Sequence, residues 1–469
     1  MKTYQDLLKV ENEEDARIKF VRDVISDYKL SDRYKTGCIA KEYYDHKNVT
    51  INEFQKLLYK VTGEVVPDNY SANWKMAHNF LNRFVTQENQ HLLGNGPTWS
   101  SPDTAKKLGK NFDVELSNAG EAALWGGVAW GFWNLDHLKV FSVKEFAPLQ
   151  DEEDGAYKAG VRFWQIDSTK PLRAVLYELD GYTEYIWRDG KGEVLHQKRG
   201  YIEKHVSTKV DGDQIYDYEN YPTFPIVPLW GNKSHQSELV GLREQIDCYD
   251  LIKSGFANDV DDASLIYWTI QNADGMDDTD LAKFVERMRT LHATAIDDEG
   301  AKAESHSVEL HYESKEVLLT RLRADLYEDA MALDTKSLAS GGSIVTAVIE
   351  AAYKPLDDKC DKYEFCVKDF LDDILSLAGI EDENPTFTRS MISNKSENIS
   401  NVLQAAQYLG EEYTISKLLN IFGDGDMVEE ILKRRNEEDM GRFTSGAEEG
   451  EKSEENEEAN NSTGEEENE

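Results

Sequence analysis

The pattern of polar and apolar residues near the start of the chain predicts helices, and the spacing of three or four is clearest at Trp74, His78, Leu81, Val85, Glu88 and Leu92. We expect helical structure within residues 15–47, a helix from 52 to 62, and another from 75 to 93. The last of these should stop at Gly94-Asn95-Gly96-Pro97, because glycine and proline interrupt helical hydrogen bonding. The first part of the chain is therefore expected to be mainly helical.

The pattern changes between residues 135 and 221. Runs such as 161–166 and 173–179 are rich in β-branched and aromatic residues, and they are interrupted by Asp180-Gly181 and Asp189-Gly190. Asp-Gly pairs between such runs indicate antiparallel hairpins. A β-rich middle with helices on either side predicts an α+β fold.

A second helical region follows this β-rich part. Apolar residues on one face predict a helix at residues 238–263, and Leu318, Leu322 and Leu326 predict another at 315–333. The insert between the two helices contains a predicted strand at 265–271 and a predicted helix at 280–289. The apolar face of the first helix consists of Leu239, Leu242, Ile246, Tyr249, Ile252, Phe256 and Val260.

A loop rich in serine and glycine comes after the second of these helices. It reads Lys336-Ser337-Leu338-Ala339-Ser340-Gly341-Gly342-Ser343, and a long helix is predicted from 344 to 378. Pro355 should kink that helix, because proline removes a backbone donor. Two long helices that meet at a flexible loop predict a protrusion.

Three tryptophans are interleaved with glycines at Trp125, Gly126-Gly127, Trp130, Gly131 and Trp133. We interpret them as a helix that packs tightly through its glycines, with a ligand platform as the alternative.

The longest apolar stretch, residues 122–133, is too short to span a bilayer, and residues 1–10 lack a signal-peptide pattern. We therefore expect no contact with a membrane.

The chain is strongly acidic, with 52 Lys+Arg against 90 Asp+Glu and a net charge of -38. This balance argues against a protein that holds nucleic acid by neutralising its phosphates, although DNA could still slide past its surface. Residues 444–469 contribute eleven acidic residues and one lysine, and we expect this tail to be disordered. Four scattered cysteines, Cys38, Cys248, Cys360 and Cys366, indicate neither a disulfide framework nor a zinc site.

Motifs for catalysis are few. The sequence has no P-loop, no H-E-x-x-H and no G-x-S-x-G. An acidic cluster, Asn258, Asp259, Asp261 and Asp262, could in principle hold Mg²⁺ for a nuclease, but a solvated helix end is the favoured interpretation. We expect no cofactor, no metal site and no enzymatic activity.

The order of these segments resembles that of a known family, the portal proteins of tailed bacteriophages, in particular those of siphophages. The similar segments are residues 74–80 with 92–97, residues 127–130 with 145–148 and 161–164, and the strongest set, Phe224 to Lys233 with Ser237-Glu238-Leu239 and 245–250. Residues 344–369, 386–390 and 398–419 continue the resemblance to about residue 435. The chain has Ser343-Ile344-Val345-Thr346-Ala347-Val348 where family members often carry Ser-Gly-x-Ala-Leu-Lys. The resemblance therefore does not define at which residues the loop around 336–343 begins and ends.

The resemblance implies a domain organisation. The expected parts are an N-terminal helical region (1–73), a wing of helices and antiparallel strands (74–237), a first stem helix (238–263), a small α/β clip (264–314), a second stem helix (315–333), a tunnel loop (334–343), a long wing helix (344–385), a helical crown (386–440) and a disordered acidic tail (441–469).

The resemblance also implies a function, that of a head-to-tail connector. Portal subunits form a ring, usually of twelve copies, at one capsid vertex of the virion, and double-stranded DNA passes through it. The expected partners are the terminase motor, a head-completion adaptor, and the capsid and scaffold proteins, with assembly in the host cytoplasm. The tunnel loop would present Lys336, Ser337, Ser340, Gly341, Gly342 and Ser343 to DNA, and Arg321 and Arg323 would line the stem.

Two alternatives stay open. One is another virion or scaffold structural protein, which would not form a ring with a central hole. The other is a metal-dependent nuclease that uses Asp259, Asp261 and Asp262.

Overall fold

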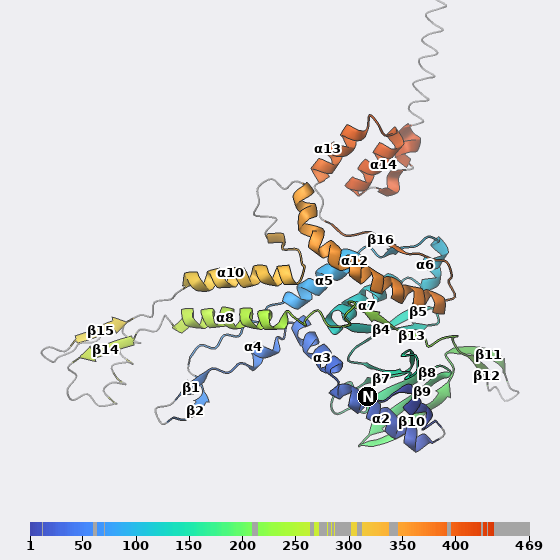
Figure 1. Cartoon of the computed structure of the whole chain (residues 1–469), viewed down its shortest axis with the longest axis horizontal. Coiled ribbons are helices and arrows are strands. Elements are labelled where there is room, and N and C mark those ends of the chain that lie inside the picture. Colours follow the sequence, from blue (N-terminus) through green and yellow to red (C-terminus); the bar gives the residue numbers. More distant parts are fainter. Residues whose placement is uncertain are drawn as a thin grey trace, which may run out of the picture. The chain divides into compact units, whose positions relative to one another are not determined.

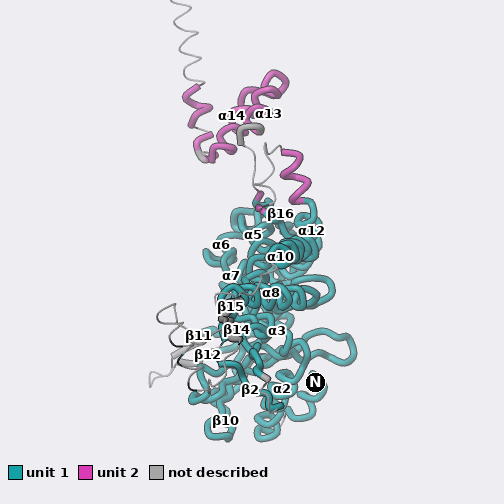
Figure 2. The backbone as a smooth tube through the Cα atoms, turned by 90° about the vertical axis from the view of Figure 1, so that its left-hand side faces the viewer, with its two compact units in different colours: residues 1–334, 354–390 teal, residues 335–353, 391–469 magenta. Residues whose placement is uncertain are grey.

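The computed structural model describes residues 1–11, 13–59, 63–69, 71–208, 214–262, 267–271, 279, 283, 286, 302–306, 312–336, 346–391, 395–423, 425–428 and 430–435. The chain divides into two compact units (Figure 2). The first contains Met1–Asp334 and Lys354–Ser390, and the second contains Thr335–Tyr353 and Met391–Glu469. One long helix, α12 (Thr346–Leu377), belongs to both, and the division falls beside Pro355.

The N-terminal helices are α1 (Tyr4–Leu8), α2 (Glu14–Leu30), α3 (Asp32–Tyr44) and α4 (Val49–Glu53). Ser31 divides the predicted helical stretch 15–47, because its side chain accepts a hydrogen bond from the Tyr34 backbone N–H and caps α3. The predicted helix at 52–62 is wrong. Strand β1 (Leu57–Tyr59) pairs there with β2 (Val65–Pro67) in an antiparallel hairpin, and this local strand pairing replaces the predicted helix.

The next segment contains α5 (Phe80–Leu93), β3 (Pro97–Thr98), α6 (Pro102–Leu108) and α7 (Phe112–Gly126). Helix α5 ends next to Gly94, as predicted, but it begins at Phe80 instead of residue 75. Residues 74–78 are not helical, because their backbone donors bind side chains of another helix, described below.

The β-rich middle is antiparallel, as predicted. Five strands form one sheet in the order β10-β9-β8-β7-β6, and three form another in the order β13-β4-β5. Asp180-Gly181 and Asp189-Gly190 lie at two hairpin turns, between β8 and β9 and between β9 and β10. The bounds are β4 (Val128–Asn134), β5 (His137–Ser142), β6 (Phe146–Gln150), β7 (Tyr157–Trp164), β8 (Leu172–Glu178), β9 (Gly181–Arg188), β10 (Lys191–Arg199) and β13 (Ile226–Trp230); β11 (Ile202–Thr208) and β12 (Gln214–Glu219) form a separate hairpin.

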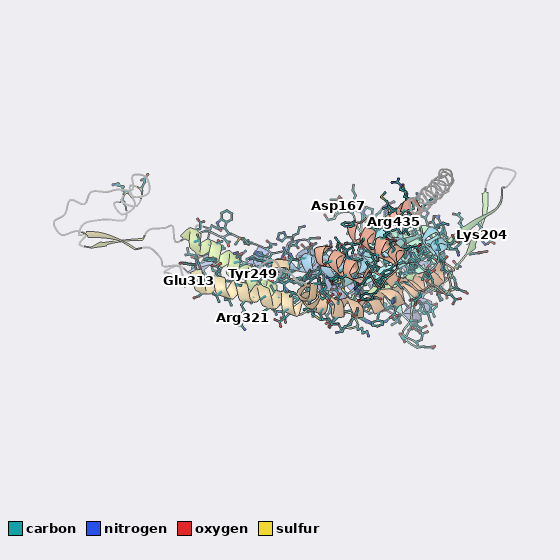
Figure 3. The ribbon with its side chains drawn as sticks, turned by 90° about the horizontal axis from the view of Figure 1, so that it is seen from above. Asp167, Lys204, Tyr249, Glu313, Arg321 and Arg435 are labelled. Carbon is teal, nitrogen blue, oxygen red and sulfur yellow. The ribbon has the colours of Figure 1, made fainter. Side chains whose placement is uncertain are left out.

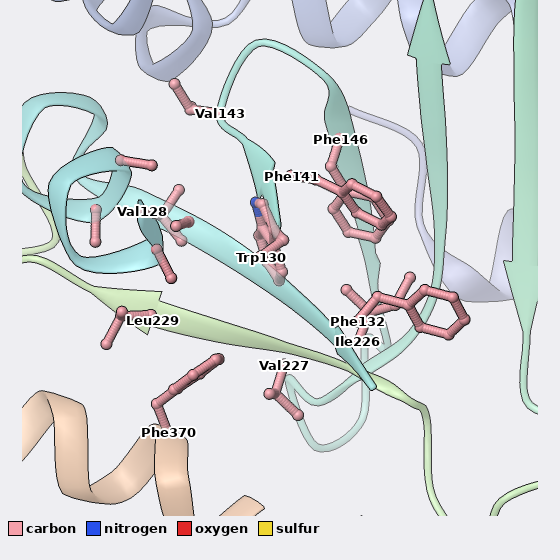
Figure 4. Packing of buried hydrophobic residues seen from close by; sticks show 14 of the residues in the cluster. Val128, Trp130, Phe132, Phe141, Val143, Phe146, Ile226, Val227, Leu229 and Phe370 are labelled. Carbon is pink, nitrogen blue, oxygen red and sulfur yellow. The ribbon is translucent and has the colours of Figure 1, made fainter. Parts of the chain in front are cut away.

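The tryptophans with interleaved glycines do not form one helix, so that interpretation was wrong. Helix α7 ends at Gly126, and Gly127 takes the left-handed conformation with φ 80°. Trp130 lies on β4 (Figure 4). Trp133 lies on the same strand. Both tryptophan side chains are buried, and the Trp130 ring lies 4.9 Å from that of Phe146. Aromatic side chains therefore fill the core between the sheets and the helices.

Gly127 gives a test of this helix-to-strand junction. A Cβ at this position would lie 3.0 Å from backbone atoms of Gln236 and Ser237, and a positive φ is unfavourable for other residues. We expect Gly127→Ala to lower the free energy of unfolding by about 1–2 kcal/mol, measured by urea denaturation. Gly255→Ala is the matched control: open space surrounds Gly255 in its helix, so alanine should raise stability by up to about 1 kcal/mol. Equal effects of the two substitutions would contradict this account.

The remaining elements include two long helices, α8 (Arg243–Asp262) and α10 (Tyr312–Asp329), and the paired strands β14 (Tyr267–Gln271) and β15 (Lys302–His306). Strand β14 confirms the predicted strand in the insert, whereas the predicted helix at 280–289 lies largely outside the described residues. Strand β16 (Thr386–Phe387) pairs with β3 in the first unit. The second unit contains α13 (Lys395–Ala405), α14 (Glu411–Phe422) and a short 3-10 turn (Gly425–Met427). Within the described part of the chain, no helix is long and apolar enough to span a bilayer.

Candidate functional site at the paired helices

Helices α8 and α10 lie side by side in the first unit (Figures 1 and 3). Near one end of the pair, Gln245 donates a hydrogen bond to Asp329. Near the other end, Lys315 forms an ion pair with Asp259. The start of α8 thus meets the end of α10, so the two helices are antiparallel.

The predicted apolar face of α8 is only partly buried. Ile246 is fully buried near the start of the helix, together with Leu326 of α10, whereas Val260 and Leu318 are largely exposed. At the same buried end of the pair, the centre of the Tyr327 ring lies 5.2 Å from that of Phe84 on α5. The paired helices are therefore anchored at one end and expose apolar side chains towards the other.

A second face of α8 buries polar side chains, which the apolar spacing did not predict. Asp250, Ser254 and Asn258 are all buried. Their oxygens accept hydrogen bonds from the backbone N–H groups of the non-helical segment 74–78, namely His78 (3.1 Å), Met76 (2.9 Å) and Trp74 (2.6 Å). We call this row of three side chains the α8 ladder.

The spacing of the α8 ladder has a simple geometric basis. Four residues of an α-helix rise about 6 Å. Two residues of an extended chain advance about 6.6 Å. Side chains four apart on a helix therefore match alternate N–H groups of an extended segment beside it. The ladder explains why residues 74–78 do not join α5, although their sequence has helical spacing.

Asp250 has the largest number of contacts in the ladder. It accepts hydrogen bonds from the backbone N–H and the ring Nδ1 of His78, the latter at 2.7 Å, and from the side-chain amide of Asn48. One turn earlier, Asp247 binds the hydroxyl groups of Tyr43 and Thr50. The two aspartates of the Ile246-Asp247-Cys248-Tyr249-Asp250 segment thus tie α8 to the N-terminal helices.

A buried charge cluster lies where the paired helices join the rest of the first unit. The Lys359 ammonium on α12 lies 2.7 Å from the Glu88 carboxylate on α5 and 2.7 Å from that of Glu238, which precedes α8. It also donates a hydrogen bond of 3.2 Å to the Ala330 carbonyl at the end of α10. One cation therefore connects four segments that are far apart in the sequence.

The buried surroundings shift the pKa values of Glu88 and Lys359. Burial raises the pKa of Glu88 to about 7, and Lys359 offsets only part of that effect. Burial by itself would lower the pKa of Lys359, but the two neighbouring carboxylates raise it above its ordinary value. We conclude that Lys359 is charged at neutral pH and that Glu88 depends on it for its own charge.

The predicted DNA-contacting residues have different surroundings. Lys336 is exposed, whereas Ser337, Ser340, Gly341, Gly342 and Ser343 lie outside the described residues. Arg321 is exposed on α10 (Figure 3). Arg323 instead forms an ion pair of 2.7 Å with Asp334, and its guanidinium lies 4.9 Å from the Tyr327 ring.

Three of the four residues in the acidic cluster at the end of α8 have partners in the structure, and the side chain of Asp262 lies outside the described part of the chain. Asn258 belongs to the α8 ladder, Asp259 pairs with Lys315, and Asp261 accepts a hydrogen bond of 3.3 Å from the Trp74 indole. Across the described residues, no group of three or more histidine, cysteine or acidic side chains is arranged to hold a metal ion. These contacts favour a structural role for the cluster over the nuclease alternative.

Comparisons with known proteins match most of this chain to one family. A family model described as "Phage portal protein, SPP1 Gp6-like" matches residues 28–441. The portal protein of Bacillus phage SPP1 is 24% identical over 416 residues, covering 80% of this chain and 79% of its own length. The portal protein of Clostridium phage phiCD119 is 24% identical over 400 residues, covering 76% of this chain and 83% of its own length.

Among solved structures, a chain from the virion of a native gene transfer agent particle aligns with a TM-score of 0.39 and 12% identity, covering 72% of this chain and 89% of that chain. The family is assigned from the sequence match and not from this structural alignment. The matched residues, 28–441, include α8, α10 and the described β-rich part. The chain belongs to the SPP1 Gp6-like family of phage portal proteins.

Proposed function

We propose that copies of this chain form a closed ring, of twelve subunits as the resemblance implies, at one vertex of the capsid. Double-stranded DNA would enter the head through this ring during packaging and leave through it at ejection. Membership of the portal family supports the proposal. The observation that carries it further is the antiparallel pair of α8 and α10, which can form the wall of an axial channel.

Within this pair, α10 is the better candidate to face DNA. The ladder face of α8 is covered by residues 74–78 of the same subunit. Helix α10 instead has a long exposed face with both acidic and uncharged side chains and one arginine: Glu313, Glu316, Val317, Thr320, Arg321, Ala324 and Glu328.

This composition suits a channel through which DNA must slide. Each phosphate that a wall neutralises adds a favourable contact, which translocation would then have to break. A largely acidic wall with few cations therefore keeps friction low. Of the two stem arginines, Arg321 is the better candidate for DNA contact, because Arg323 is occupied by Asp334 and Tyr327.

Lys336 provides the direct test of a DNA-facing segment. We expect Lys336→Glu to leave ring formation intact but to reduce the DNA packaged per particle several-fold, because a negative charge at a constriction repels the duplex. Packaged DNA would be measured by nuclease protection, and ring assembly by size-exclusion chromatography. Lys107→Glu, the same charge change at an exposed position on α6, is the matched control. If rings of Lys336→Glu take up as much DNA as wild-type rings, Lys336 does not contribute to the passage of DNA.

The other assignments follow from the same proposal. The segment 264–314, which contains the paired strands β14 and β15, would dock to the terminase motor during packaging and to a head-completion adaptor afterwards. The β-rich wing would face the capsid and scaffold proteins. We infer a structural role without catalysis, with assembly in the host cytoplasm and a final place at the portal vertex of the virion.

A further inference from the structure

Two cavities adjoin helix α2 in the first unit. Their volumes are about 620 Å³ and about 560 Å³, and both lie in the range of about 300–1,000 Å³ that is typical of ligand pockets. Gln165, which follows β7, and Leu172, which begins β8, line both cavities. Lys29 of α2 lines the larger cavity and Arg22, two turns earlier, lines the smaller one. We call the two cavities together the α2 groove.

The α2 groove is basic, although the chain as a whole is strongly acidic. Its charged lining consists of six cations and three carboxylates, whereas the chain has 52 Lys+Arg against 90 Asp+Glu. The cations are Arg22, Lys29, Lys41, Lys144, Lys170 and Arg188, and the carboxylates are Glu115, Glu145 and Asp189. A cleft with this excess of cations attracts an anionic partner to one place on a surface that otherwise repels it.

Most of these cations are not neutralised by the chain itself. Lys41 pairs with Asp45, and Arg188 pairs with Glu193. The other four form no ion pair with any carboxylate among the residues that the structure describes; they are Arg22, Lys29, Lys144 and Lys170. Their charges are therefore available to a ligand that brings carboxylates or other anionic groups.

Apolar side chains form another part of the lining. Tyr34, Val140, Trp164 and Leu172 are half-buried and line the larger cavity. Duplex DNA presents mainly phosphates, so it would leave these apolar groups without a partner and would be repelled by the carboxylates beside them. A polypeptide segment can supply every group that the lining needs: carboxylates for the cations, backbone N–H groups for the glutamates and an apolar side chain for the wall.

The acidic tail of the chain lacks one of these groups. Residues 444–469 contain eleven acidic residues, but no aromatic residue and no valine, isoleucine, leucine or methionine. Such a segment offers carboxylates to the lysines and nothing to the apolar lining. A segment that carries both carboxylates and a large apolar side chain must come from a second protein.

We propose that the α2 groove binds an extended acidic segment of a second protein, with an apolar side chain of that segment against Trp164 and its carboxylates near Lys144 and Lys170. An extended chain advances about 3.3 Å per residue and two turns of α2 rise about 10.8 Å, so a segment of about six residues reaches both cavities. The inference does not depend on ring formation, because every residue of the lining belongs to the first unit of one subunit.

Fluorescence anisotropy of the full-length chain with a labelled peptide tests this site. The probe is a peptide of about ten residues, mostly glutamate with one central phenylalanine, which is long enough to span the groove. Lys144→Glu and Lys170→Glu, one in each cavity, should each weaken its binding about five-fold or more, because each converts an attraction into a repulsion. Lys35→Glu is the matched control, since it makes the same charge change at an exposed position of α3 outside the groove. Failure of the probe to bind, or unchanged binding by either groove variant, would overturn the inference.

Three further measurements distinguish the possible occupants. A peptide of residues 444–469 should bind at least about ten-fold more weakly than the probe, because it has no apolar side chain to bury. Equal binding of this peptide would assign the groove to the chain's own tail. Tighter binding of a short DNA duplex, weakened by Lys144→Glu, would assign it to nucleic acid. Probe binding to monomers but not to rings would show that a neighbouring subunit covers the groove. Each of these last three results would overturn the inference, and none of them would exclude the proposed ring.

Discussion

Replacing Asp250 with alanine should lower the free energy of unfolding by about 3 kcal/mol, one of the two largest effects that we expect from a single substitution. The carboxylate is fully buried and accepts hydrogen bonds from the backbone and ring of His78 and from Asn48. Alanine would leave these donors unpaired, and each buried unpaired donor costs about 1–3 kcal/mol. Urea denaturation followed by tryptophan fluorescence measures the change.

The matched control for this prediction is Asp259→Ala, nine residues along the same helix. Asp259 is partly exposed and pairs only with Lys315, and exposed ion pairs contribute about 0.2–1 kcal/mol. A loss of similar size for the two variants would show that the α8 ladder does not stabilise the fold. Hydrogen exchange at Trp74, Met76 and His78 should also rise in Asp250→Ala alone.

Replacing Lys359 with methionine should destabilise the chain by about 3–5 kcal/mol at pH 7, because it leaves two carboxylates, Glu88 and Glu238, near each other without a cation. Methionine keeps the length of the side chain, so the change tests charge more than volume. Urea denaturation measures it, and Lys354→Met on the same helix is the control, since Lys354 forms an exposed pair with Asp358. A loss below about 1 kcal/mol would contradict the role given to Lys359.

The effect of Lys359→Met should also depend on pH in a defined direction. Burial already raises the pKa of Glu88 to about 7 in the presence of Lys359, and removal of the cation should raise it further. The folded state then binds more protons than the unfolded state above the ordinary glutamate pKa, so stability falls as pH rises. We therefore expect acidification from pH 7 towards pH 5 to restore part of the lost stability. Glu88→Gln in the same background should remove this dependence.

Local patterns were sufficient to predict much of the fold. Asp-Gly pairs between β-branched runs located two hairpin turns of the five-stranded sheet, and apolar spacing located α8 and α10. These elements are determined by residues close together in the sequence: a turn needs only its own few residues, and an amphipathic helix needs only a buried face.

Two of the errors fall where distant segments decide the outcome. Residues 74–78 have helical spacing, yet Asp250, Ser254 and Asn258 hold them in a non-helical conformation from more than 170 positions away. Trp130 and Trp133 were predicted to lie in a helix. The helix ends before Gly127, and the tryptophans lie in a strand that pairs with β13, almost a hundred residues later.

The candidate site was predictable in outline but not in its chemistry. The spacing of Leu318, Leu322 and Leu326 indicated a helix, but it could not show that Arg323 is occupied by Asp334 while Arg321 is exposed. The cluster around Lys359 likewise joins Glu88, Glu238 and the Ala330 carbonyl, which no local pattern connects. The sequence does place Glu88 in the helical spacing of Leu81, Val85 and Leu92, and a carboxylate on a buried helix face requires a partner.

The most direct test of the central claim is cryo-electron microscopy of the purified full-length chain. The account predicts a closed ring with an axial opening, with α10 on the inner wall and the ladder face of α8 turned away from the opening. A preparation that contains only monomers or open assemblies would contradict the claim that the chain forms a ring. A closed ring with α10 on its outer surface would contradict the assignment of the channel wall.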